Sequence, residues 1–128
     1  MQWLPFHNLI EPDYQQILRT FQAVFPHATL WYTGGTHTLL VATPNRLTAE
    51  ELVARLQRVA NDPIVKDDLG PALTIGSSWL MDEDGLRTYA GAGALTTDNN
   101  AYFLPQDRDN ERLLQMMQGL ARQAQAGK

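Results

Sequence analysis

The stretch Thr20–Thr43, TFQAVFPHATLWYTGGTHTLLVAT, constrains the fold more than any other part of the chain. It begins as the end of a helix, is broken at Pro26, and continues as two apolar runs on either side of Gly34–Gly35. These runs, at about 28–33 and 37–43, are rich in β-branched and aromatic residues, which favours strands. Paired glycines supply the positive φ angles of a tight turn, so we predict an antiparallel hairpin.

The centre of the second strand, Leu39–Ala42, is apolar at every position. A strand with one wet face alternates between apolar and polar residues, so we predict that this strand is covered on both faces. The sequence offers it one clear partner, the 28–33 run, and its other edge is therefore expected to be open. Because an open apolar edge is a template for pairing with another chain, we expect a homodimer, formed by pairing of the 38–43 strands or by packing of exposed helix faces.

Amphipathic helices are predicted on both sides of the hairpin. Glu11-Pro12-Asp13 suits a first helical turn, and apolar residues then recur at helical spacing until Pro26. Thr48 and Glu51 form a T-x-x-E capping box in front of a second helix. Further short helices are predicted over 63–69, from Ser77 or Ser78 through Leu80, from Asp82 to Tyr89, and from Asp109 or Asn110 along the stripe Leu113, Met116, Met117, Leu120 and Ala124, with an extended piece at Tyr102–Leu104. The side chains expected to be largely buried are Ile17, Leu18, Phe21, Trp31, Leu39, Val41 and Leu56.

Length and composition indicate one α/β domain. The 128 residues are 44% hydrophobic and carry a net charge of −4, and no basic stripe is visible, so no nucleic-acid partner is expected. The absence of cysteine excludes disulfides and thiolate catalysis, and it fits a reducing, cytoplasmic setting. No apolar run approaches the roughly 20 residues of a membrane span. We expect a single domain over 1–128, with 1–10 as a truncated strand end and lead-in and 124–128 as a frayed tail.

The residues that could carry chemistry are scattered. The three histidines, at positions 7, 27 and 37, lie in separate segments without metal-ligand spacing, so we expect no metal site. The acidic clusters at 67–68 and 82–84 could bind a cation or a polyamine, but capping of helix ends explains them at least as well. Ser77-Ser78 lacks the G-x-S-x-G context of a nucleophile, and Gly34-Gly35 lacks a phosphate-loop pattern. We therefore assign no catalytic residue.

Two stretches carry a resemblance to a known family. The first is Q-W-L-P at 2–5, followed by a helix that ends T-F…V-F-P-H at 20–27 and a strand at Leu30-Trp31. The second is L-T-T-D-N-N at 95–100, which looks like an L-N-T-D-D turn. In this order and spacing, the motifs resemble the C-terminal half of spermidine synthase-like proteins, most closely the bacterial branch. The similarity spans most of residues 2–105.

The resemblance implies a small sheet flanked by helices that corresponds to the C-terminal half of a methyltransferase-like Rossmann domain. In that family, decarboxylated S-adenosylmethionine and the catalytic aspartate belong to the first half, whose glycine-rich fingerprint is not found in this sequence. The chain alone is therefore expected to be inactive and to hold no cofactor, while its parent would be a polyamine aminopropyltransferase.

Gln2 resembles a family pocket position, and Trp3 and Tyr32 are further candidates for contact with a polyamine in the parent. Two departures from the family pattern are Tyr32–Thr36 in place of a proline- and tyrosine-rich loop and Asn99 in place of an aspartate. The alternative function is a non-catalytic interaction or assembly module that has kept the fold.

Overall fold

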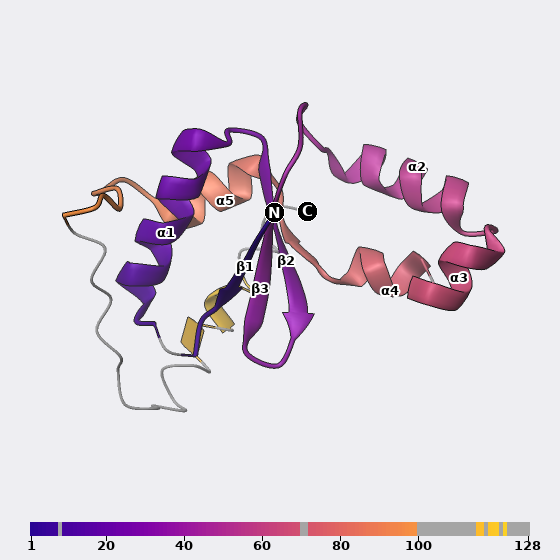
Figure 1. Ribbon diagram of the computed structural model, residues 1–128, viewed down its shortest axis with the longest axis horizontal. Helices are drawn as coiled ribbons and strands as arrows, with labels where there is room; N and C mark the ends of the chain where they lie inside the picture. The colour runs from indigo at the N-terminus through magenta and orange to yellow at the C-terminus, as the bar shows by residue number, and fades with distance from the viewer. Residues whose placement is uncertain (8, 70–71, 100–114, 117, 121, 123–128) are drawn as a thin grey trace.

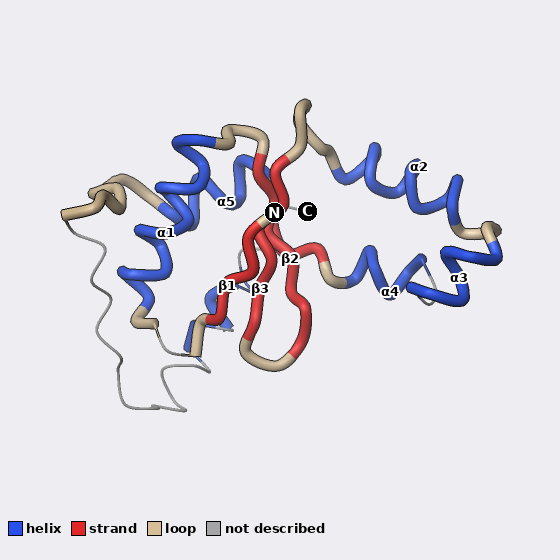
Figure 2. Tube along the Cα trace, in the orientation of Figure 1, coloured by secondary structure: helices blue, strands red, loops and turns tan. Residues whose placement is uncertain are grey.

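The protein is α/β in a computed structural model that describes residues 1–7, 9–69, 72–99, 115–116, 118–120 and 122. Its described elements are β1 (Gln2–Pro5), α1 (Glu11–Val24), β2 (Ala28–Gly34), β3 (His37–Ala42), α2 (Ala49–Val59), α3 (Pro63–Leu69), α4 (Ala72–Ser77), β4 (Trp79–Met81) and α5 (Glu83–Ala90). The four strands form one antiparallel sheet at the centre of the molecule, coloured red in Figure 2.

The strand order in the sheet is β1-β3-β2-β4. β3 lies inside the sheet, because it pairs antiparallel with β1 on one side and with β2 on the other. The prediction that the 38–43 strand has an open edge was therefore wrong. The segment predicted as a truncated strand end covers that edge within the chain. Because β1 and β2 are both antiparallel to β3, they run parallel to each other, and α1 connects them.

The glycine turn forms as predicted. β2 and β3 are joined through Gly34 and Gly35, whose φ angles are +98° and +59°. The register shifts between Tyr32 and Gly34, so the hairpin carries an irregularity next to its turn. A positive φ is strained for residues that carry a Cβ, which explains why glycines occupy both positions.

One face of the sheet forms the core. Leu4, Leu30 and Leu40 lie on this face and are buried against α1 and α5. On the opposite face Leu39 and Val41 are partly buried, so the prediction that β3 is covered on both faces holds in full only for the face toward α1. Of the side chains predicted to be largely buried, Leu18 is completely so, whereas Ile17, Phe21, Trp31, Leu39, Val41 and Leu56 are partly exposed.

Local sequence signals explain the helix boundaries. The Thr48 hydroxyl accepts from the Glu51 N–H at 3.2 Å and the Glu51 carboxylate accepts from the Thr48 N–H at 3.3 Å, as the capping box predicted. Asp82 caps α5 by accepting from the Gly85 N–H at 2.8 Å. The helix predicted from Ser77 or Ser78 through Leu80 was wrong. Trp79–Met81 is strand β4, because the available edge of β2 provides hydrogen bonds that a local pattern cannot reveal.

Helices α2, α3 and α4 form an arm on the side of the sheet opposite to α1 and α5 (Figure 1). Leu47 and Leu52 are buried at the start of this arm, while Val53 and Ile64 are exposed. In the last part of the chain, Met116 and Leu120 of the predicted stripe are buried and join the core. Leu113, Met117, Ala124, the 102–104 piece and the 124–128 tail lie outside the described residues.

Candidate functional site

The three residues suggested as polyamine contacts lie on two faces of the sheet. Gln2 is opposite Leu40 and Tyr32 is opposite Thr38, so both belong to the α1 side, whereas Trp3 belongs to the other face. β3 separates Gln2 from Tyr32 by two strand spacings, roughly 10 Å. Gln2 is exposed, and its Nε2 donates to the Trp3 carbonyl at 2.9 Å. The Tyr32 hydroxyl donates to the Gly35 carbonyl at 2.9 Å. The sheet therefore does not bring the three side chains into one pocket.

Trp3 belongs instead to a row of tryptophans that the sequence analysis did not anticipate. The register pairs Trp3 with Leu39, Leu39 with Trp31, and Trp31 with Trp79, one residue from each strand. All three tryptophans of the chain thus lie on one face of the sheet, with Trp31 beside Trp79 and with Leu39 between Trp3 and Trp31. The rings of Trp31 and Trp79 are stacked, with centroids 5.8 Å apart. We call these three tryptophans and Leu39 the tryptophan row. Side chains alternate between the two faces along a strand, so the sequence could have assigned each tryptophan to a face of its own strand. Only the register between strands shows that the three lie in one row.

Two histidines flank the exposed end of the row. His37 stacks on Trp3 with ring centroids 4.3 Å apart, and His7 approaches His37 edge-on at 5.4 Å. His7 Nδ1 is also 2.9 Å from the Thr36 hydroxyl. Trp3 nevertheless has 54% of its surface exposed. This end of the row can stack against an apolar or planar group, but it offers no carboxylate from these residues to neutralise a cation.

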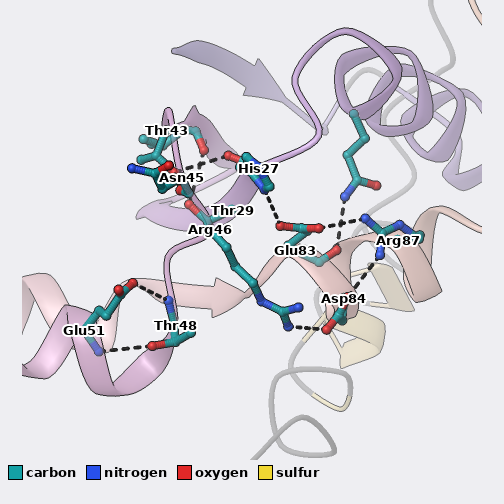
Figure 3. Close-up of polar contacts among 12 residues, drawn as sticks. His27, Thr29, Thr43, Asn45, Arg46, Thr48, Glu51, Glu83, Asp84 and Arg87 are labelled. Carbon is teal, nitrogen blue, oxygen red and sulfur yellow. Dashed lines mark hydrogen bonds and ion pairs between the residues drawn. The ribbon is translucent and has the colours of Figure 1, made fainter.

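A cluster of polar side chains lies where α5 begins (Figure 3). His27 Nδ1 and Glu83 Oε2 are 2.8 Å apart, and Arg87 donates to Glu83 Oε1 at 2.9 Å. Arg87 also donates to Asp84 at 3.0 Å, and Asp84 in turn pairs with Arg46. The cluster joins the start of β2, the loop between β3 and α2, and α5. His27 and Glu83 are 56 residues apart in the sequence, so no local sequence motif could have revealed this cluster.

The electrostatics of Glu83 follow from these contacts. The hydrogen bond from His27 lowers the pKa of Glu83 below its ordinary value of 4.5, burial opposes this shift, and Arg87 reinforces it. Its side chain is 11% exposed. Because each carboxylate oxygen already faces a donor, Glu83 is a structural joint between elements and is poorly placed to accept a proton from a substrate.

The polar face of α1 holds the segment that follows α5. Arg19 donates to the carbonyls of Ala90 and Ala94, the latter at 3.2 Å, and Gln15 donates to the Tyr89 carbonyl at 3.1 Å. The Thr96 N–H donates to the Thr20 hydroxyl at 2.7 Å. We call residues 90–96 the strap. It leads directly into residues 97–99, so the contacts of the strap with α1 fix where this turn begins.

No group of three or more His, Cys, Asp or Glu side chains within the described residues is arranged to hold a metal ion. Over the same part of the chain, no helix combines the length and apolar character needed to cross a membrane. Comparisons of the chain with models of known families, with characterised proteins and with solved structures give no match.

Proposed function

We propose that this chain is the C-terminal part of a spermidine synthase-like aminopropyltransferase and contributes part of a polyamine pocket and an assembly surface in its parent. The observation that carries the proposal is the order β1-β3-β2, in which an antiparallel strand lies between two parallel strands connected by a helix. In the family fold that the chain resembles, a strand that ends at Gln2-Trp3 would be the second neighbour of the 37–43 strand, and β1 lies at that side of β3. The Q-W-L-P motif occupies β1, from Gln2 to Pro5, and the position of β1 beside β3 supports the proposal.

In the parent, the reaction is an in-line displacement. The nitrogen of a polyamine attacks the methylene carbon bonded to the sulfonium of decarboxylated S-adenosylmethionine, the C–S bond breaks, and the amine loses a proton. The first half of the fold supplies the cofactor site and the base. This chain supplies Gln2 at the start of β1. Trp3 lies on the opposite face of the sheet and Tyr32 lies two strands away, so neither forms a pocket wall together with Gln2. Alone, it should neither bind the cofactor nor turn over putrescine.

Reconstitution tests the proposal. The cofactor-binding half of a bacterial spermidine synthase-like protein, expressed separately, is mixed with this chain, and thioether product is quantified with putrescine as acceptor. We expect each part to be inactive alone and the mixture to be active. Gln2→Ala should lower the rate severalfold, whereas Gln57→Ala, on the exposed side of α2, should leave it unchanged. Association without turnover would favour the second candidate, and turnover by this chain alone would refute the proposal.

The second candidate is a non-catalytic interaction or assembly module. The half-exposed tryptophan row favours it, because large apolar side chains that remain accessible commonly mark interaction sites. A homodimer belongs to this candidate. Since β3 is interior, such a dimer would have to use exposed side chains and not the 38–43 edge. Light scattering on wild-type protein and on Trp3→Ser distinguishes a dimer that depends on the row from one that does not.

A further inference from the structure

The hydrogen-bond pattern of β1 determines which of its backbone groups face outward. The Phe6 N–H donates to the Thr36 carbonyl at 3.0 Å, and the register continues as Leu4↔Thr38 and Gln2↔Leu40. Hydrogen-bonded pairs alternate along an antiparallel ladder, so the even-numbered residues of β1 bond to β3. The backbone groups of Trp3 and Pro5 therefore point away from β3, toward the outer edge of the sheet.

Few of these outward groups can receive another strand. Pro5 has no N–H to donate. The Trp3 carbonyl already accepts from Gln2 Nε2 at 2.9 Å. Within Gln2–Pro5, the remaining outward groups are the Trp3 N–H and the Pro5 carbonyl, and the strand is only four residues long. Short edge strands and prolines are recognised devices that protect edges from strand addition.

We propose that Gln2 and Pro5 guard the outer edge of β1, so that a strand can be added there only after the Gln2 carboxamide leaves the Trp3 carbonyl. The Gln2 side chain thus occupies the Trp3 carbonyl reversibly, as a cap, whereas Pro5 lacks a backbone N–H altogether. Both features oppose pairing between copies of the chain through this edge, which lies next to the half-exposed Trp3. The inference concerns the chain by itself and stands independently of the proposed function.

The test compares wild-type protein with the double variant Gln2→Thr/Pro5→Thr, which removes the cap and restores the N–H without adding a large apolar group. The matched control is Gln57→Thr/Pro44→Thr, two exposed positions away from β1. Hydrogen exchange at the Trp3 amide is measured by NMR as protein concentration rises, together with sedimentation velocity. Protection at this amide reports pairing at the edge, because the Trp3 N–H is one of the two outward backbone groups that remain within Gln2–Pro5.

We expect Trp3 amide protection to grow with concentration only in the Gln2→Thr/Pro5→Thr variant, with self-association about tenfold tighter than wild type, equivalent to about 1.4 kcal/mol. Wild type and control should show no such protection. The proposal is overturned if the wild-type Trp3 amide becomes protected equally well, or if the variant remains unprotected. Should the double variant fail to fold, Gln2→Thr alone provides the same test, because it removes the cap and keeps Pro5.

Discussion

The two faces of the sheet differ in how completely they are covered. Leu40 and Leu39 are neighbours in β3, yet Leu40 is 0% exposed under α1 while Leu39 is half-buried in the tryptophan row. On the α1 side, the core also includes a buried hydrogen bond between Tyr14 and Thr38, at 2.7 Å. On the other side, Trp3 is 54% exposed. An apolar strand sequence therefore does not guarantee equal burial, because coverage depends on where the helices are placed.

The largest expected effect tests this asymmetry directly. Leu40→Ala should lower the free energy of unfolding by about 2–5 kcal/mol, because it opens a cavity in a closed core. Leu39→Ala, on the adjacent residue, should cost about 1 kcal/mol, because its site is already partly hydrated. Urea unfolding of both variants measures the difference. Equal losses would mean that the tryptophan face is covered as completely as the α1 face.

A smaller effect is expected for the polar contact in the closed core. Tyr14→Phe removes the hydroxyl that bonds to Thr38, while the Thr38 hydroxyl keeps its contact with the Leu4 carbonyl at 3.2 Å. The loss of stability should be about 1 kcal/mol, the net value of one buried hydrogen bond. Burial raises the pKa of Tyr14, so its hydroxyl stays neutral in the native protein. Thermal unfolding near neutral pH is the measurement, and a loss as large as that of Leu40→Ala would contradict it.

The cluster at the start of α5 should make stability depend on acid pH. The pKa of Glu83 is lowered in the folded state, so its contribution is complete above the ordinary value of 4.5 and is lost as pH falls through the folded value. Denaturant unfolding of wild type should weaken over this acidic range. Glu83→Gln should flatten that part of the pH profile, whereas Glu50→Gln, exposed in the first turn of α2, should preserve it. If the two variants gave identical dependences of stability on pH, the contacts of Glu83 with His27 and Arg87 would not contribute to stability as expected.

The smallest effect should be confined to the strap. A Cβ at Gly93 would lie 2.9 Å from Arg19 Nη2, so Gly93→Ala should displace the guanidinium from the carbonyls that it holds. We expect faster hydrogen exchange in the strap, because the substitution displaces Arg19 and also strains the backbone at Gly93, whose φ is +158°. Gly91→Ala serves as the control, because Gly91 also has a positive φ, of +64°, but a Cβ there would have no atom within 4 Å. Unchanged exchange in Gly93→Ala would show that Arg19 does not hold the strap.

Much of the local structure was predictable from the sequence, because its causes are local. Gly34-Gly35 specified the hairpin turn, Thr48 and Glu51 the capping box, and Asp82 the start of α5. These features depend on backbone conformation and on hydrogen bonds between residues close in sequence. The four-stranded sheet flanked by helices agrees with the predicted α/β class at this level, while the identity of the parent fold stays a proposal.

Only the tertiary structure decided the contacts between distant segments. β1 pairs with one edge of β3, Trp79–Met81 pairs with β2 as strand β4, and His27 contacts Glu83. In each case the strand edge or charged group is paired by a distant segment that the topology brings next to it. The tryptophan row has the same origin. The sequence fixes that side chains alternate along a strand, but the register between strands decides which of them become neighbours.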